Sequence, residues 1–338
     1  MKFIRFLSVL VFVGAVILFG KYKEEAMQYE DTVSPLITMD SEVLTINCNA
    51  SRSALLKGVT AVDDQDGDVS DTLIVESMSN FIEKGRRTYT IAAFDSSNNI
   101  TKVTREVIYK DYTSPKFYLE EPCSFPLDTK NMLLSIEAMD KLDGDITSRI
   151  KMSTEYYVQV DEPGIYPMVF TVSNSAGDVS KLPVNIEIYD PMIKSRQPEI
   201  ILTDYLIYID QDEEINPWDY VEEIHARNRT YLRNEADNIL HDEALEKQFD
   251  RELQKLKGKA RTNKLKSKDD YKFTITSEEL LIENNVNVNV PGTYEIIYQY
   301  DAYIAEEDDN GTIIEDDRTA EEIEEATGTV RLIVVVNE

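Results

Sequence analysis

The sequence predicts an all-β protein, in which tandem antiparallel β-sandwich domains follow an N-terminal transmembrane helix. The first observation is a repeat: the tripeptide Asp-Gly-Asp at 66–68 returns at 143–145, and a Ser-Pro dipeptide precedes each copy. The two prolines, Pro35 and Pro115, lie 80 residues apart, which is the length of a small β-sandwich. The second observation is that apolar residues alternate at period two in the stretches that close each repeat, as in strands with one buried face.

The first predicted element is the membrane helix in residues 1–20. After a basic start, its apolar stretch carries a single charge, Arg5, which can reach the interface, so the segment is long enough to span a bilayer. We expect an uncleaved signal-anchor with the basic end inside and the rest of the chain outside the cytoplasm. A cleaved secretory signal is the alternative, but Leu18 is a poor partner for Gly20 at a cleavage site. Residues 21–34 form a polar, acidic spacer.

The first two sandwiches are predicted over 35–111 and 112–190. The second shows the pattern best, because after Pro163-Gly164 it carries two alternating apolar series on either side of a glycine-containing turn: Tyr166, Met168, Phe170 and Val172, then Leu182, Val184, Ile186 and Ile188. Two such runs around a turn predict an antiparallel hairpin with one buried face.

A third, altered copy is predicted over 191–338. It keeps a hairpin signal at Pro291-Gly292 and ends on a strand, but it lacks the Asp-Gly-Asp element. A helical insertion is predicted at about 219–268, on apolar residues spaced three to five apart: Leu232, Ala236, Leu240, Leu245, Phe249, Leu253 and Leu256. An acidic loop is predicted at about 303–326. Because the chain ends on a strand, we expect the N-terminal helix to be the only membrane anchor.

Composition narrows the class of partner. The formal net charge of −29 argues against nucleic acid, since binding a phosphate backbone requires a basic face. Hydrophobic residues make up 42% of the chain, which is too many for a disordered acidic tail. The two cysteines, Cys48 and Cys123, fall in different repeats, so we expect free thiols; an interdomain disulfide would require the two sites to meet.

These residues resemble bacterial Ig-like domains of the pesticidal crystal protein Cry22Aa type. The acidic element of that family matches 63–70 and 140–147, and its hairpin element matches from Gly164 onward. The first repeat departs from the pattern at Arg87, where the family has tyrosine, and at Asn98, where it has glycine. The resemblance covers 35–190 well and 191–338 in part. It implies extracellular modules of a surface protein with no shared catalytic residue, and hence no enzyme.

The aspartate-rich turns are candidate Ca²⁺ ligands, because Ca²⁺ takes carboxylate oxygens at alternating positions. Five aspartates lie between Asp63 and Asp71, but a glutamate that would close a calcium loop is missing: Val75 takes that place. The alternative, which the residues favour, is a tight turn whose aspartates accept backbone N–H bonds. The candidate metal ligands are Asp63, Asp64, Asp66, Asp68, Asp140, Asp143 and Asp145.

Two charged segments lie in the third repeat. Residues 251–268 hold eight basic side chains and one acid, and 306–325 hold eleven acids and one base. Three interpretations remain open: solvated faces, pairing with each other, or docking of the basic segment onto an anionic wall polymer or lipid headgroups. The candidate binding residues are Arg251, Lys255, Lys257, Lys259, Arg261 and Lys264.

The remaining chemistry-bearing residues indicate no catalytic site. His225 and His241 lie on the predicted helical insertion without a third ligand, so surface positions are expected rather than a zinc site. Trp218 and its neighbouring tyrosines are expected in the core. The predicted function is therefore a non-catalytic cell-surface protein: a stalk that presents a terminal domain for adhesion, bound to an unknown protein or a cell-wall polymer. The alternative is a carbohydrate-binding or envelope-assembly module. No cofactor is expected, apart from a possible Ca²⁺.

Overall fold

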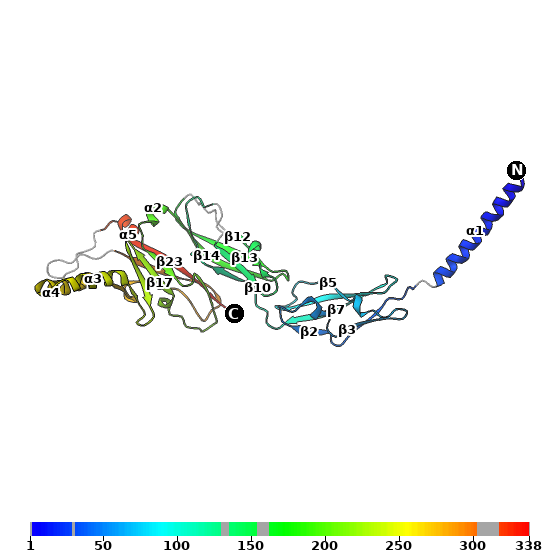
Figure 1. The fold of residues 1–338 in the computed structure, drawn as a ribbon, viewed down its shortest axis with the longest axis horizontal. Coiled ribbons are helices and arrows are strands. Elements are labelled where there is room, and N and C mark those ends of the chain that lie inside the picture. The colour runs from blue at the N-terminus through cyan, green and yellow to red at the C-terminus, as the bar shows by residue number, and fades with distance from the viewer. Residues whose placement is uncertain (1, 29–30, 130–134, 154–161, 303–317, 338) are drawn as a thin grey trace. The chain divides into compact units, whose positions relative to one another are not determined.

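The computed structural model describes residues 2–28, 31–129, 135–153, 162–302 and 318–337, and shows one apolar helix followed by β-sheets (Figure 1). Helix α1 (Lys2–Gln28) contains a 21-residue stretch, Phe3–Lys23, that is long and apolar enough to cross a membrane. A signal sequence has the same length and composition. A helix satisfies its own backbone hydrogen bonds, so an apolar segment of this kind can sit in lipid.

The chain divides into two compact units. The first comprises residues 1–114 together with 141–143 and 174–178. It holds two sheets that face each other. One has the order β1 (Leu36–Met39), β3 (Val59–Asp63), β4 (Gly67–Asp68), and the other has the order β2 (Val43–Ile46), β7 (Ile100–Tyr109), β6 (Arg86–Phe94), β5 (Ile74–Met78). Inward-facing residues of both sheets, among them Ala61, Ile91 and Val107, form one core. This is a β-sandwich.

The second unit holds the rest of the chain from Pro115 and contains two further pairs of sheets. The first pair consists of β11 (Gly144–Asp145), β10 (Ile136–Asp140), β8 (Lys116–Leu119), and of β12 (Lys151–Ser153), β13 (Gly164–Ser173), β14 (Val179–Tyr189), β9 (Ser124–Pro126). The predicted hairpin is confirmed: β13 and β14 pair antiparallel over their length, and Met168, Phe170, Leu182 and Ile186 are buried.

The second pair in this unit is formed by the third repeat. One sheet has the order β15 (Glu199–Leu202), β17 (Val221–Ala226), β18 (Arg229–Asn234), β19 (Ile239–His241), β20 (Thr274–Ile275). The other has the order β16 (Leu206–Ile209), β23 (Thr327–Val336), β22 (Gly292–Asp301), β21 (Leu281–Asn284). In all three repeats a short strand pairs in parallel with the last long strand, as β2 with β7, β9 with β14 and β16 with β23. The third repeat therefore keeps this pairing although it lacks Asp-Gly-Asp.

Helical elements are few. The α-helices after α1 are α2 (Pro191–Lys194), α3 (Glu243–Lys255), α4 (Gly258–Lys266) and α5 (Ala320–Ala326), and 3₁₀ turns occur at Arg52–Leu56, Ser70–Thr72, Thr147–Arg149, Pro217–Tyr220, Ser267–Asp270 and Ser277–Glu279. The all-β prediction with one N-terminal helix is confirmed at this level. The division into three separate domains stays a prediction.

The two sheet pairs of the second unit share buried residues. Ile333 of β23, from the third repeat, packs with Phe117 and Ile186 in the core of the second repeat. In addition, the amide of Phe117 donates to the hydroxyl of Tyr208 at 2.9 Å. A strand that contributes to two cores restricts independent movement of the sandwiches on either side.

The predicted helical insertion at 219–268 is wrong in its first half. Residues 221–241 form the strands β17, β18 and β19, and Leu232 and Ala236 are exposed. Alternating burial of β-branched and aromatic side chains explains the strands, because Val221, Ile224 and Tyr231 face the core. The second half is confirmed by α3 and α4, where Phe249 and Leu253 are buried.

The predicted acidic loop at 303–326 falls mainly outside the described residues, which omit 303–317. Its described end forms α5, which begins with a capping box: the hydroxyl of Thr319 and the carboxylate of Glu322 each accept a backbone N–H of the other residue. Arg318, just before the helix, pairs with Asp301 at 2.6 Å.

Candidate functional site

The Asp-Gly-Asp elements fix turns. The carboxylate of Asp66 accepts the amide and the hydroxyl of Ser96 at 2.7 and 3.0 Å, and Asp143 accepts the same two groups of Ser175 at 2.7 and 2.6 Å. Gly67 supplies the positive φ of +74° that the turn requires. The middle of the acidic element is therefore tied to the hairpin turn of the same repeat, which is the turn interpretation that the sequence favoured.

The last aspartate of each element accepts a hydrogen bond from the first residue of a short 3₁₀ turn. Asp68 accepts the amide of Ser70 at 3.0 Å and Asp145 accepts that of Thr147 at 2.9 Å. These hydrogen bonds lower the pKa of both carboxyls, chiefly through the side chain of Ser70 and the amide of Thr147 respectively. Both carboxylates are exposed, as is Asp64. Their hydrogen bonds explain the positions of Asp68 and Asp145 without a metal.

Asp63 differs from its neighbours, because it belongs to a buried cluster of three carboxylates with Asp31 and Asp95. One oxygen from each residue lies within 4.8 Å of the other two, and the three residues are 7%, 4% and 4% exposed for Asp31, Asp63 and Asp95. Asp31 follows α1 in the chain, Asp63 ends β3, and Asp95 follows β6. The candidate ligands Asp64, Asp66 and Asp68 do not belong to this cluster.

A network of hydrogen bonds holds the cluster. Asp95 Oδ1 accepts the amides of Ser97 and Asn99 at 2.9 and 2.8 Å. The side-chain amide of Asn99 donates to Asp95 Oδ2 at 2.8 Å and to the carbonyl of Asp31 at 3.0 Å. Burial raises the pKa of the Asp95 carboxyl, but the bonds from Asn99 and Ser97 together outweigh burial and lower it. Asp95 is thus held as an anion in a buried place.

Sequence reasoning missed Asp31 and Asp95 because neither lies near the Asp-Gly-Asp element. The spacing of the repeat could have found them. Matching Pro35 with Pro115 places Asp111 against Asp31, matching the two acidic elements places Asp140 against Asp63, and matching the two hairpin turns places Asn174 against Asp95. Acidic or amide residues therefore occupy the same three positions in both copies.

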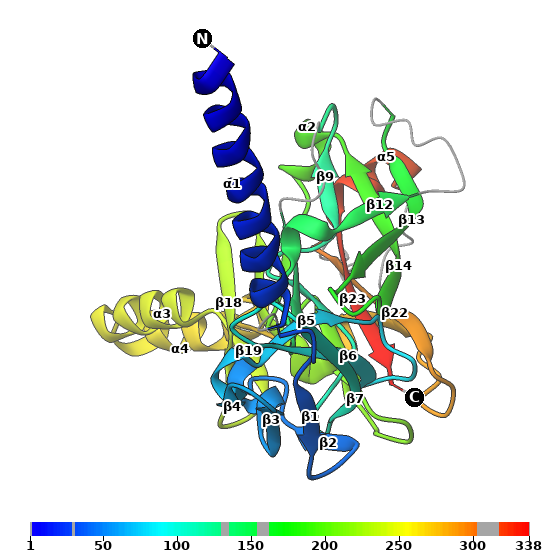
Figure 2. The ribbon, with the colours of Figure 1, turned by 90° about the vertical axis from the view of Figure 1, so that its right-hand side faces the viewer.

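The candidate binding residues lie on α3, on α4 and, for Lys257, between them, and the two helices are side by side next to β18 and β19 (Figures 1 and 2). Helix α3 begins at an N-cap, Asp242, whose carboxylate accepts the amide of Leu245 at 3.0 Å. Its buried face packs on two aromatic residues that precede β20. Phe249 contacts Tyr271 and Phe273 edge to face, with ring centroids 5.1 and 5.5 Å apart. The helical hairpin thus has a small core of its own.

Five of the six candidate binding residues are exposed, and we call them the cationic hairpin surface: Arg251, Lys255, Lys257, Lys259 and Arg261. The sixth, Lys264, is internal. Its ammonium lies 3.0 Å from Glu252 and stacks over the rings of Phe249 and Tyr271, with nitrogen-to-centroid distances of 4.9 and 4.6 Å. Lys264 therefore holds the hairpin together, while the other five present positive charge to solvent.

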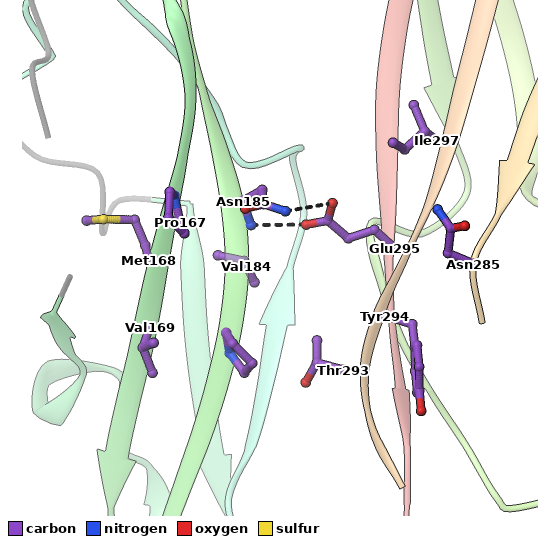
Figure 3. Close-up of a pocket in the computed structure, with 11 residues that line it drawn as sticks. Pro167, Met168, Val169, Val184, Asn185, Asn285, Thr293, Tyr294, Glu295 and Ile297 are labelled. Carbon is purple, nitrogen blue, oxygen red and sulfur yellow. Dashed lines mark hydrogen bonds between the residues drawn. The ribbon is translucent and has the colours of Figure 1, made fainter. Parts of the chain in front are cut away.

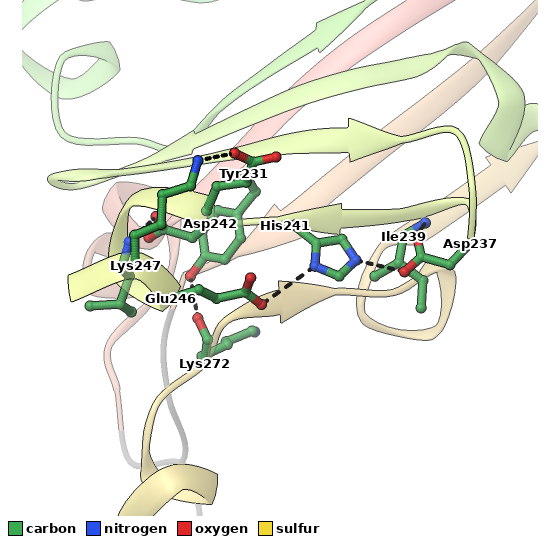
Figure 4. Close-up of polar contacts among 10 residues, drawn as sticks. Tyr231, Asp237, Ile239, His241, Asp242, Glu246, Lys247 and Lys272 are labelled. Atoms are coloured by element: carbon green, nitrogen blue, oxygen red, sulfur yellow. Dashed lines mark hydrogen bonds and ion pairs between the residues drawn. The ribbon is translucent and has the colours of Figure 1, made fainter. Parts of the chain in front are cut away.

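The two histidines lie on strands rather than on a helix. His241, on β19, has Asp237 2.9 Å and Glu246 3.5 Å from its ring nitrogens (Figure 4). His225, on β17, has Glu223 at 2.7 Å and Glu199 at 3.5 Å. Each imidazole is thus flanked by its own pair of carboxylates.

The aromatic cluster around Trp218 belongs to the core. Trp218 is 6% exposed, its indole N–H donates to the carbonyl of Asn238 at 2.9 Å, and Arg233 lies over its ring. Tyr205 and Tyr220 pack against the same core and are half-buried. These rings stabilise the third sandwich and offer no open stacking platform.

A groove of about 400 Å³ lies between β13 and β14 on one side and β22 on the other (Figure 3). Its walls are mostly apolar, and one polar contact crosses it: the amide and the side-chain nitrogen of Asn185 donate to the carboxylate of Glu295 at 3.0 and 3.1 Å. Both oxygens of Glu295 are used in this contact. The groove therefore lies between two sheet pairs of the second unit, which the contact of Asn185 with Glu295 links.

No protein-family model and no curated protein matches the sequence. Among solved structures, the chain is similar to the CBM51-2 and INT domains of Clostridium perfringens ZmpB, with 13% identity over 45% of this chain and 41% of that one, at a TM-score of 0.19. It is also similar to the protocadherin GammaB4 extracellular domain, with 12% identity over 90% of this chain and 49% of that one, at a TM-score of 0.17. The chain spans less than half the length of both. The fold assignment stands on the sheets described above and not on these similarities.

Proposed function

We propose that this chain is a non-catalytic, membrane-anchored surface protein of bacterial Ig-like domains whose third repeat carries the binding surface. The long apolar segment of α1 supports anchoring, and its basic start supports an exported remainder. The alternating strands and the parallel pairing of the first and last strands in each repeat support Ig-like modules. The first repeat then serves as part of a stalk.

The observation that carries this proposal is the cationic hairpin surface. On a chain with a formal net charge of −29, five exposed basic residues on two short helices and the link between them form a local region of opposite sign. Helix α3 packs on its own small core, and the ion pair of Lys264 with Glu252 links α4 to it, so the charges are presented on a defined element. Such a surface attracts polyanions and raises the rate of encounter with them. We propose that the partner is an anionic polymer of the cell envelope.

Co-sedimentation of the full-length protein in detergent with purified cell envelopes tests the proposal. The test variant reverses the five charges of the cationic hairpin surface to glutamate. A control variant reverses five exposed lysines elsewhere: Lys57, Lys84, Lys110, Lys151 and Lys181. We expect the test variant to lose most binding and the control, which has the same net charge, to retain most of it.

Two results would contradict the proposal. Equal loss in both variants would show that total charge, and not the hairpin, governs binding. Binding to anionic lipid vesicles but not to lipid-free envelopes would assign the surface to headgroups instead. The alternative function, a carbohydrate-binding module, would need an exposed aromatic platform, and Trp218 does not provide one.

A further inference from the structure

The buried cluster of Asp31, Asp63 and Asp95 belongs to the first unit, whereas the binding surface proposed above belongs to the second, and nothing in that function uses the cluster. Three carboxylates within 4.8 Å of one another repel strongly where water is largely excluded. Among the described residues, no ion pair with lysine, arginine or histidine involves any of the three. A buried anion without a compensating charge is costly, and a cation bound from solution would offset that cost.

Asp63 supplies an oxygen with no protein partner. Its Oδ2 accepts the amides of Gln65 and Asp66 at 2.8 and 3.1 Å, whereas its Oδ1 is buried and has no hydrogen-bond partner. Buried polar atoms are nearly always paired, so the unpaired oxygen of this buried carboxylate is available to coordinate a cation. This atom is the second, independent sign of a ligand.

The negative charge of Asp95 is not needed for the turn that it caps. In the second repeat Asn174 occupies the matching position, and its side-chain oxygen accepts the amides of Ala176 and Asp178, both at 3.0 Å. Asp95 Oδ1 makes the same two contacts with Ser97 and Asn99. An amide therefore serves the turn equally well, and the charge at position 95 requires another explanation.

We propose that Asp31, Asp63 and Asp95 bind a Ca²⁺ ion. Hard carboxylate oxygens are the ligands that Ca²⁺ prefers, and oxygens that share one ion at about 2.3–2.6 Å lie at most about 5 Å apart. The three oxygens fall within that distance as they stand. Asn99 positions two of the ligands, because its side-chain amide donates to the carboxylate of Asp95 and to the carbonyl of Asp31.

The site gives the ion a structural role. Asp31 comes from the segment that follows α1, whereas Asp63 and Asp95 come from the ends of strands in the first sandwich. A bound ion therefore ties residues 31–34 to the sandwich, in addition to the bond from Asn99. Calcium, which is abundant outside the cytoplasm, would order the membrane-proximal start of the first repeat only after export.

Isothermal titration of the chelator-stripped full-length protein in detergent with CaCl₂, and in a second arm with MgCl₂, tests the site. We expect one Ca²⁺ per chain and a rise in melting temperature with Ca²⁺ concentration. Asp95→Asn keeps the turn and removes one charged ligand, so we expect Ca²⁺ binding to weaken by about tenfold or more. Asp64→Asn, next to the cluster but exposed, is the matched control and is expected to bind like the wild type.

A second readout separates a ligand from a fold effect. In chelator, Asp95→Asn is expected to melt at or above the wild-type temperature, because it relieves repulsion; in Ca²⁺ it is expected to melt below the wild type. The proposal is overturned if the wild type shows no Ca²⁺ heat, if Asp95→Asn binds Ca²⁺ like the wild type, or if Mg²⁺ binds as tightly as Ca²⁺. None of these results bears on the cationic hairpin surface, so the two proposals fail independently.

Discussion

Lys264 and Glu252 form an ion pair with a nitrogen–oxygen distance of 3.0 Å, and this pair joins α4 back to α3. The same ammonium donates to the hydroxyl of Tyr271 at 2.7 Å. The hydrogen bond with Tyr271, followed by the one with Glu252, raises the pKa of Lys264. The hydrogen bond from Lys264 lowers the pKa of Glu252. One side chain of the basic segment is therefore part of the support on which the other cationic residues are displayed.

Replacing Lys264 should loosen the hairpin. We expect Lys264→Met to be cleaved by thermolysin within 251–268 roughly several-fold faster than the wild type, because local opening exposes the backbone. Lys266→Met is the control, since Lys266 lies on the same helix and is exposed. Mass spectrometry of the fragments identifies the cleaved segment. Equal cleavage rates in the two variants would show that Lys264 does not support the hairpin.

Tyr208 should make the second unit sensitive to alkali. Burial raises the pKa of its phenol to about 12, from an ordinary value of 10.0. A raised pKa stabilises the folded state fully below pH 10, and that contribution is lost as the pH rises through 12. Tyr231 and Tyr298, whose pKa values burial also raises, act in the same direction.

The contribution of Tyr208 follows from comparison with Tyr208→Phe. The variant should be less stable than the wild type at pH 7 by about 1 kcal/mol, because the amide of Phe117 loses its acceptor. Urea denaturation at pH 7 and at pH 11 measures both effects. The difference between the two proteins should shrink at pH 11. A constant difference would contradict the assigned pKa.

Cys123 should be an unreactive thiol. Burial, with a smaller effect from Glu295, raises its pKa to about 12, and the thiolate is the reactive form. In a Cys48→Ser variant, the remaining thiol should react with Ellman's reagent at pH 8 only when the protein is unfolded by denaturant. Rapid reaction of the folded variant would show that the cysteine is accessible. Neither Cys48 nor Cys123 forms a disulfide in the structure, as the sequence predicts.

Gly328 should tolerate no side chain. A Cβ atom at this position would collide with the backbone carbonyl of Pro198, which has no flexible end to move aside. We expect Gly328→Ala to destabilise the second unit by about 1–3 kcal/mol. The control is Gly292→Ala on the paired strand, where the nearest atom belongs to a tyrosine side chain at 3.4 Å. Equal stability of the two variants in urea would contradict this packing.

The strands that the sequence predicted well are those in which alternation and burial coincide. Met168, Phe170 and Leu182 are buried as expected, because a hairpin with one dry face imposes period two on its residues. Prediction failed at 221–241, where leucines happened to fall at helical spacing. There the side chains of Ile224 and Tyr231 face a sandwich core, and that tertiary burial decides the structure.

The candidate sites were predicted only in part. Exposed basic residues on α3 and α4 follow from composition, but the inward position of Lys264 depends on rings contributed by Phe249 and Tyr271. The acidic cluster joins Asp31, Asp63 and Asp95, which are about 32 residues apart in sequence and meet only when the sandwich closes. The local sequence pattern pointed to the Asp-Gly-Asp turns as candidate Ca²⁺ sites, but their aspartates mostly accept hydrogen bonds from backbone amides.

The most direct test of the account is the affinity of the full-length protein for a soluble, purified anionic wall polymer, measured at about 0.05 M and about 0.5 M NaCl, where screening of exposed charges differs strongly. The account predicts that the wild type binds at low salt and weakens by about tenfold or more at high salt, while the variant with the five hairpin charges reversed binds weakly at both. Binding by that variant as tight as the wild type at the low salt concentration would contradict the claim that the third repeat carries the binding surface.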